Sequence, residues 1–386
     1  MSSESGMEVL SDGATLGKYR ISKRLGEGGM GVVYAAMHER LGRPVAIKVL
    51  RRELSRNNEQ SSRFQMEAEL VTRIGHPNIV QVYDFGRLPD DSLYFVMEMI
   101  KGESLRDRLL KKPLSDQEVV QTFGPLLSAL RAAHGIGVVH RDLKPDNVML
   151  IDGEGGSFSS VKLLDFGIAK IRGEEAASGA VAAAGAEALA SHPSTASAPA
   201  VDALKTAAGA IMGTPAYMAP EQIKNSSKVD KRADIYAIGV MLYEVLGGRR
   251  PFVGSFGELI GQHLFEKPEL PSAMAQSNSM PPRQISWPKV DAVVMRMLAK
   301  EPDDRYPDCA SLQAALEEAW GQSFSQAQTK TLSTAVSTVA PPKPAASRLR
   351  KIILPAAAVA TVLGLGTVAG LRLLRQPSVQ TKQHHA

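Results

Sequence analysis

The stretch "VVHRDLKPDNVML", from Val138 to Leu150, places six polar or charged residues between two apolar runs. Charged side chains are rarely buried unless they are paired or bound to something. A polar loop between two strands is the simplest interpretation, but it explains neither the mixture of charge signs nor the closing Asn147. The alternative is a loop that holds a metal ion, a phosphate group and a proton acceptor together. The rest of the chain decides between the two.

The composition is that of a globular protein with unevenly distributed charge. The 386 residues suffice for two or three domains, and 44% are hydrophobic. Residues 321–386 carry eight Lys or Arg and no Asp or Glu. Because the whole chain has a net charge of +5, residues 1–320 by themselves are mildly acidic. We therefore expect no nucleic-acid partner. The single Cys309 suits a reducing compartment, and the polar start of the chain lacks the apolar core of a secretory signal.

Changes in composition divide the chain into segments. An Ala-rich insert over residues 173–210 lacks aromatic residues and alternating apolar positions, so it cannot build a core. Residues 321–351 have the Ser, Thr, Pro and Ala content of a linker. Residues 352–371 follow without a single charge, and residues 372–386 form a short tail.

The uncharged segment 352–371 predicts one C-terminal transmembrane helix. Its 20 residues match the length that spans a bilayer, and basic residues suited to lipid headgroups flank it. The alternative is a buried helix of a soluble domain, but no globular sequence follows for it to pack against.

Before these segments the pattern changes from strands to helices, which predicts an α+β fold. After a tail of residues 1–16, five strand-like runs occupy 19–26, 31–38, 44–50, 79–87 and 93–100. A helical pattern over residues 57–75 separates the third run from the fourth. Residues 101–320 are mostly helical, most clearly over 115–137 and 232–248. We expect a small β-rich lobe over 17–100 and a larger α-helical lobe over 101–320.

The stretch "LGEGGMGVVY" contains a G-x-G-x-x-G-x-V pattern at Gly26, Gly28, Gly31 and Val33. Glycines allow a tight hairpin whose backbone can approach phosphate groups. A plain hairpin would use the same residues. A dinucleotide fingerprint would need a helix after the glycines, whereas a strand-like run follows here.

Lys48, in "PVAIKVL", is predicted to need an anionic partner. It shares one strand face with Ala46 and Leu50, and that face is partly apolar. Glu67 in the following helical segment is the first candidate and Glu69 the second, although either would also serve as a surface carboxylate.

Oxygen-bearing side chains form a second candidate constellation. Asp165, in "LLDFGIAK", follows an apolar strand and precedes Gly167. Together with Asp142, Asp146 and Asn147 it offers the oxygen ligands that hard cations prefer.

Taken together, these motifs resemble the protein kinase family, and in particular the eukaryotic-like (Hanks-type) bacterial serine/threonine protein kinases. The resemblance covers residues 17–320. The ordered matches are the glycine-rich loop, Val45-Ala46-Ile47-Lys48, His140-Arg141-Asp142, Asn147, Asp165-Phe166-Gly167 and Ala219-Pro220-Glu221. It implies a bilobal kinase fold in which residues 173–210 enlarge the activation segment, the stretch that follows Asp165-Phe166-Gly167 and ends at Ala219-Pro220-Glu221.

The resemblance implies a non-specific serine/threonine protein kinase that transfers the γ-phosphoryl group of Mg-ATP to protein hydroxyls. The implied catalytic residues are Asp142 for the substrate hydroxyl, Lys144 near the transferred group, Lys48 with Glu67 for the phosphates, and Thr214 beside Asp142. Asn147 and Asp165 would hold Mg²⁺, or Mn²⁺ in its place. His140 would be a structural hydrogen-bonding residue.

The implied nucleotide contacts surround the phosphates and the adenine ring. They are Leu25, Gly26, Glu27, Gly28, Gly29, Met30, Gly31, Val33, Ala46, Lys48, Met97, Glu98, Ile100 and Met149. The Glu98 carbonyl and the Ile100 amide would meet the adenine edge, and Met97 would guard the rear of the pocket.

Further matches indicate the acceptor class and internal anchors. Lys144 and "GTPAYMAPEQ" resemble serine/threonine rather than tyrosine kinases. Asp234 would anchor the catalytic loop, which begins at His140-Arg141-Asp142 and closes at Asn147, and Arg305 would pair with Glu221. Arg141 provides a cation for a phosphorylated activation segment. Thr206 is the first candidate for that phosphate, and Ser194, Thr195 and Ser197 are weaker ones.

Two alternatives remain beside a membrane-anchored signalling kinase: a pseudokinase scaffold that binds ATP without efficient transfer, and a small-molecule phosphotransferase of related fold. Because ATP is cytoplasmic, we expect a single-pass protein of the inner cell membrane with the kinase domain in the cytoplasm. Gly366 and Gly370 form a G-x-x-x-G that would pair two such helices into a homodimer, although so Ala- and Gly-rich a segment also produces this spacing by chance.

Overall fold

The computed structural model describes residues 10–28, 31–56, 58–153, 158–166, 215–224 and 229–324, all within one compact unit. For some residues of the first two helices, including Glu67, only the main chain is described. The predictions for Gly29, Met30, Thr214, the insert 173–210 and the segments after residue 324 lie outside these residues.

The first sheet confirms the five predicted strands and adds a short one. Its order is β1-β2-β3-β4-β6-β5, with every neighbouring pair antiparallel. The strands are β1 (Thr15–Leu16), β2 (Tyr19–Glu27), β3 (Gly31–His38), β4 (Arg43–Leu50), β5 (Val82–Arg87) and β6 (Leu93–Glu98). β5 begins later than predicted because Ile79 and Val80 instead pair with Leu163 of another strand.

The alternation of β4 separates two apolar clusters. Val45, Ile47 and Val49 belong to one cluster, whereas Ala46 and Leu50 belong to the other. Because successive side chains of a strand point to opposite faces, Lys48 lies on the face of Ala46 and Leu50, as predicted.

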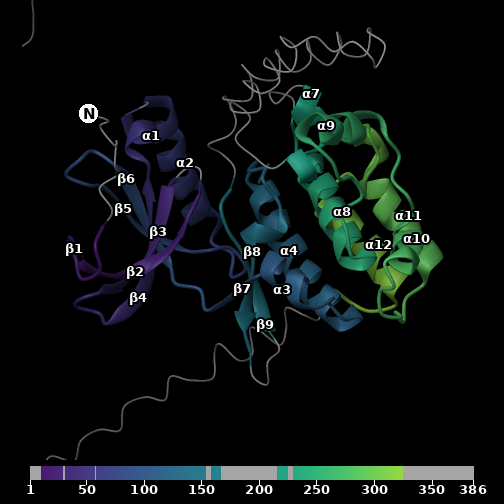
Figure 1. Cartoon of the computed structure of the whole chain (residues 1–386), viewed down its shortest axis with the longest axis horizontal. Coiled ribbons are helices and arrows are strands. Elements are labelled where there is room, and N and C mark those ends of the chain that lie inside the picture. Colours follow the sequence, from purple (N-terminus) through teal and green to yellow (C-terminus); the bar gives the residue numbers. More distant parts are fainter. Residues whose placement is uncertain are drawn as a thin grey trace, which may run out of the picture. The chain divides into compact units, whose positions relative to one another are not determined.

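Helix α2 (Asn58–Ile74) covers that second face and follows the short α1 (Arg52–Arg56). The Phe64 ring lies 4.8 Å from the Phe95 ring and 6.2 Å from the Phe85 ring. Figure 1 shows both helices beside the strands. The helix predicted over residues 57–75 is therefore confirmed to within a residue at each end.

The second part of the fold contains a three-stranded sheet and most of the helices (Figure 1). The sheet order is β7-β8-β9, with β7 (Gly102–Ser104), β8 (Val148–Asp152) and β9 (Phe158–Leu163). The helices are α3 (Leu105–Lys111), α4 (Asp116–Gly135), α7 (Pro220–Lys224), α8 (Arg232–Gly247), α9 (Phe256–Phe265), α10 (Pro271–Ser277), α11 (Trp287–Met297) and α12 (Cys309–Trp320), with single turns η1 (Pro145–Asn147), η4 (Pro215–Tyr217) and η6 (Pro302–Asp304).

Two helices define the frame of this part. A capping box between Ser115 and Glu118 starts α4, which explains why a helix begins at Asp116. Helix α8 is buried at every position except Arg232 and Glu244. A helix that is apolar on all sides belongs in a core, and α8 packs against α10 and α11.

The predicted α+β character is thus confirmed in the described part of the chain. None of the helices in that part is both long and apolar enough to cross a membrane. The span predicted over 352–371 lies outside it.

Candidate active site

The catalytic loop brings Asp142, Lys144 and Asn147 together. The Lys144 Nζ atom lies 3.1 Å from Asp142 Oδ2. The Asn147 amide nitrogen donates to the Asp142 carbonyl at 2.8 Å and to its carboxylate at 3.2 Å. Turn η1, which begins at Pro145, folds Asn147 back toward Asp142. The Lys144 ammonium and the Asn147 amide are therefore both held within hydrogen-bonding distance of the Asp142 carboxylate.

Asp234 fastens this loop to the buried helix α8, as predicted. Its carboxylate accepts the main-chain N–H groups of His140 and Arg141, both at 2.9 Å, and lies 2.7 Å from His134 Nε2. Asp234 is only 1% exposed, so these bonds are shielded from water.

Arg141 adopts an uncommon backbone conformation with φ of 64°. For a residue with a side chain this typically costs roughly 1–3 kcal/mol, and it persists only when the surroundings enforce it. Here both polar atoms of the peptide are held, the nitrogen by Asp234 and the carbonyl by the Gln222 amide at 2.9 Å. The strain therefore lies directly beside Asp142.

His140 is a structural residue, as predicted. It is fully buried, and its Nδ1 accepts the N–H of Asp142 at 3.3 Å. That bond leaves Nε2 to donate to the Leu164 carbonyl at 2.9 Å. Burial lowers the pKa of His140, so the imidazole is neutral at physiological pH. It joins the catalytic loop to the strand that leads to Asp165.

Asp165 lies next to Asn147 because strands β8 and β9 pair. Val148 is opposite Leu163, and the N–H of Leu164 donates to the Asn147 carbonyl at 2.8 Å. Lys48 Nζ lies 2.8 Å from Asp165 Oδ1, so the predicted lysine of the first sheet reaches the predicted metal residue. Asp165 also has a positive φ of 38°.

The partner predicted for Lys48 remains a prediction, because the Glu67 side chain lies outside the description. Glu69, the second candidate, is exposed on α2. The Lys48 ammonium also lies 5.7 Å from the centre of the Phe95 ring.

Asn147 and Asp165 fit a hard cation. Both hydrogen bonds from Asn147 to Asp142 use the amide nitrogen, which leaves the amide oxygen as the acceptor. In the described residues no group of three or more His, Cys, Asp or Glu gathers as a metal cage. An amide and a carboxylate suit Mg²⁺ completed by phosphate and water oxygens.

The predicted nucleotide residues of the first sheet lie opposite one another. Val33 pairs with Lys48 across β3 and β4, and Ala46 pairs with Met97 across β4 and β6. Directly opposite residues share a sheet face. The predicted apolar walls and the phosphate-binding lysine therefore line one surface.

The glycine-rich loop requires glycine at Gly31. A Cβ atom there would lie 2.0 Å from the Val49 carbonyl oxygen. The hairpin is closed by a bond from the Gly28 N–H to the Gly31 carbonyl at 2.9 Å. Leu25 is 44% exposed, and Glu27 pairs with Arg24 and Arg51.

The end of the activation segment is held to the core by two contacts, of which the sequence predicts only the first. Arg305, 1% exposed, pairs with both Glu221 oxygens at 2.7 and 2.8 Å, as predicted. The neighbouring Gln222 accepts the N–H of Ala219 at 3.0 Å while donating to the Arg141 carbonyl. Sequence reasoning missed this second contact, since a glutamine after Glu221 has no distinguishing local pattern.

A second missed network joins three elements. The Arg106 guanidinium of α3 lies 2.6 Å from the Tyr217 hydroxyl and 3.0 Å from Glu244 of α8. Burial raises the pKa of Tyr217, with the Glu244 carboxylate adding to the shift, so the phenol stays protonated. This network fixes turn η4, which follows the position of Thr214.

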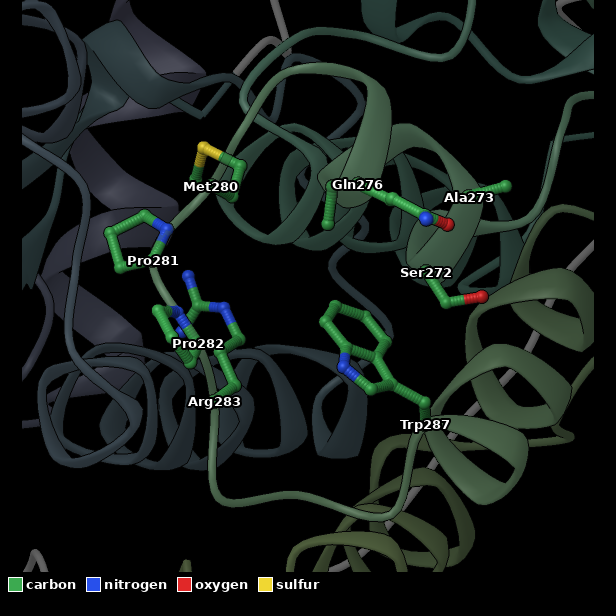
Figure 2. Close-up of a pocket in the computed structure, with 9 residues that line it drawn as sticks. Ser272, Ala273, Gln276, Met280, Pro281, Pro282, Arg283 and Trp287 are labelled. Atoms are coloured by element: carbon green, nitrogen blue, oxygen red, sulfur yellow. The ribbon is translucent and has the colours of Figure 1, made fainter.

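One cavity of about 430 Å³ lies away from all these residues. It lies between α10 and the loop before α11, and the side chains of Arg283 and Trp287 line it (Figure 2). None of the predicted site residues lines it, so it is not the predicted nucleotide site.

Lys48 reaches Asp165, and Asp142 is held beside Asn147. Together with the β-rich and helical lobes, these contacts define a kinase-like class of protein. The family model described as "Protein kinase domain" matches residues 19–320, and the chain belongs to this family.

Curated and structural relatives agree with that membership. The serine/threonine-protein kinase pkn3 of Myxococcus xanthus is 38% identical over 302 residues, which are 78% of this chain and 49% of that protein. PknB of Mycobacterium tuberculosis is 35% identical over 304 residues, 78% of this chain and 42% of that protein. The chain thus spans less than half the length of both. The crystal structure of the Mycobacterium tuberculosis PknI kinase domain aligns with a TM-score of 0.55 and 26% identity, covering 80% of this chain and 99% of that one.

Proposed function

We propose that the protein is a serine/threonine protein kinase that transfers the γ-phosphoryl group of ATP to Ser or Thr hydroxyls of proteins. The observation that carries the proposal is the assembly of Asp142, Lys144 and Asn147 on a loop anchored at Asp234. Two relatives bear the name serine/threonine-protein kinase, which supports the acceptor class.

Each residue would supply positioning or charge. Phosphoryl transfer needs alignment and neutralisation of charge more than covalent assistance. Asp142 would orient the substrate hydroxyl and receive its proton, and Lys144, 3.1 Å from that carboxylate, would face the transferred group. Lys48 would position the α- and β-phosphates.

Asn147 and Asp165 would hold Mg²⁺, which when bound neutralises phosphate charge. The magnesium identity is supported by the oxygen donors at both residues. Mn²⁺ has similar ligand preferences and would occupy the same position.

The test is a transfer assay with the purified full chain, labelled ATP, Mg²⁺ and a generic protein substrate. We expect phosphoserine or phosphothreonine in the substrate. ATP binding without transfer would instead identify a pseudokinase scaffold, and label found only on small molecules would identify a phosphotransferase of another class.

We also propose that residues 352–371 anchor the kinase in the inner cell membrane, with the kinase domain in the cytoplasm. The uncharged length and basic flanks support the anchor, and the location of ATP supports the orientation. Protease added to spheroplasts, in which the outer membrane is open and the inner membrane intact, should leave the kinase domain uncut. Cleavage there would contradict the orientation.

The same segment is proposed to pair two copies through Gly366 and Gly370. Pairing would raise the local kinase concentration and favour autophosphorylation in trans, with Thr206 as the first acceptor. The double replacement Gly366→Ile and Gly370→Ile in the membrane-inserted protein should lower cross-linking and autophosphorylation. Unchanged values would contradict the pairing.

A further inference from the structure

A partly buried ion pair joins the first sheet to the second at the predicted adenine site. Lys162 of β9 places its Nζ atom 2.6 Å from Glu98 Oε2 at the end of β6. The Lys162 side chain is 10% exposed and that of Glu98 27%. Sequence patterns gave no reason to connect these residues, which are 64 positions apart.

The connection from α2 to β5 takes part in the same contact. The Lys162 ammonium donates to the Ile79 carbonyl at 3.4 Å, and the N–H of Gln81 donates to the Glu98 carboxylate at 3.4 Å. The Glu98 main-chain N–H donates to the Gln81 carbonyl at 2.8 Å. Glu98 is therefore held through both its main chain and its side chain.

The position of Lys162 on β9 relates it to the rest of the site. It is paired directly with Met149 of β8, a predicted wall of the adenine pocket. Opposite residues of an antiparallel pair share a face, so both side chains leave the sheet on the same side. Three residues after Lys162 the chain reaches Asp165, which pairs with Lys48.

We propose that Lys162 is a positioning residue for nucleotide binding. Through the Glu98 side chain it fixes the point where β6 ends, and so fixes the main chain that would present the Glu98 carbonyl and the Ile100 amide to adenine. It also joins this main chain to the strand that leads to Asp165. The inference rests on the proposed ATP site.

The physical reason is preorganisation. A strand end has main-chain atoms that its sheet no longer restrains, and fixing a binding surface in advance reduces the ordering cost of binding. A partly buried ion pair adds little net stability after desolvation, but it strongly favours one geometry. The effect of Lys162 should therefore appear in nucleotide affinity.

The experiment compares Lys162→Met, Lys162→Arg and Glu98→Gln in the full chain. The first readout is the dissociation constant of a fluorescent methylanthraniloyl-ADP with Mg²⁺, which requires no catalysis. We expect Lys162→Met to weaken binding by about three- to tenfold, and Lys162→Arg to restore most of the loss. The KM for ATP should rise in parallel, while kcat at saturating ATP changes little.

Lys101→Met is the matched control, because Lys101 is an exposed lysine next to the same segment. It removes an equal charge and should leave the dissociation constant unchanged. The double variant Glu98→Gln with Lys162→Met should lose little more than the worse single variant, since one contact is removed only once.

An unchanged dissociation constant in folded Lys162→Met, or an equal loss in Lys101→Met, would overturn the inference while the ATP site stands. The inference would also be overturned if the loss of affinity in the double variant equalled the product of the losses in the two single variants. If Lys162→Met does not fold, Lys162→Gln is measured by the same criteria. A wild-type chain that binds no nucleotide would contradict the ATP site itself, and the inference with it.

Discussion

At the scale of single residues, Lys48 shows how a local pattern and a distant contact combine. The strand alternation puts its side chain on the face of α2, and the fold then brings Asp165 within 2.8 Å of its ammonium. We expect Lys48→Met to lower kcat/KM on the order of 100-fold or more, since a fixed charge at the phosphates acts in the transition state.

The same variant should remain folded, because the Asp165 side chain that it leaves behind is 41% exposed and can be solvated. Circular dichroism and urea unfolding check the fold, and steady-state kinetics checks the activity. A folded Lys48→Met enzyme with near-wild-type turnover would contradict the role of Lys48.

The buried His263 should lower the free energy of unfolding as the solution becomes acidic. Burial lowers its pKa from 6.5 to about 3, with the nearby Lys300 ammonium adding to the shift. The folded state thus binds the proton less readily than the unfolded state. Its contribution to stability is complete above pH 6.5 and is lost as the pH falls toward 3, by about 1.4 kcal/mol per pH unit.

The free energy of unfolding should therefore fall by about 2 kcal/mol between pH 6.5 and pH 5 on account of this group. His263→Gln should remove that part of the slope, as measured by urea unfolding at both pH values. An equally steep slope in the variant would assign the acid sensitivity to other groups.

At the scale of elements, the end of the activation segment is held by a buried ion pair. Arg305→Met would leave the Glu221 carboxylate, only 13% exposed, without its cation. Removing one partner of a buried pair typically costs about 3–5 kcal/mol. Lys224→Met is the control, because the Lys224–Glu301 pair is 49% and 66% exposed, and it should cost at most about 1 kcal/mol. Equal losses in urea unfolding would contradict the distinction.

Gln222 links helix α7 to the catalytic loop, and its replacement tests that link. Gln222→Leu would leave the Arg141 carbonyl and the Ala219 N–H without this partner, at a cost of about 1–3 kcal/mol in unfolding free energy. Because Arg141 is strained beside Asp142, kcat should fall further than in a Lys300→Met variant, which also loses two hydrogen bonds to main-chain carbonyls but none to the catalytic loop. Equal kcat values in the two would indicate a purely structural glutamine.

Local patterns predicted the elements of this protein well and their mutual contacts poorly. Alternation and glycine spacing located the strands of the first sheet, and the motif resemblance located Asp142, Asn147 and Asp165. Their apolar character places Ile79 and Val80 in the predicted strand 79–87, but that character is the same whether they pair with β6 or, as observed, with β9. The Lys162–Glu98 and Gln222–Arg141 contacts join residues far apart in sequence, and periodicity carries no information about such pairs.

At the scale of the whole molecule, the site depends on elements from both sheets and from the buried helix α8. Lys48 comes from β4, Asp165 follows β9, and the loop of Asp142 is anchored to Asp234. The proposed activity therefore requires that these parts act as one unit. Replacing the Asp142 carboxylate with an amide of equal size removes the proton acceptor and leaves this frame in place.

The most direct measurement is the rate of phosphoryl transfer to Ser and Thr by the wild-type chain and by Asp142→Asn, under identical conditions with Mg-ATP. We predict measurable transfer by the wild type and a fall on the order of 100- to 10,000-fold in the variant, with nucleotide affinity retained. Comparable transfer by the two proteins, or none by the folded wild-type chain, would contradict the proposed kinase activity.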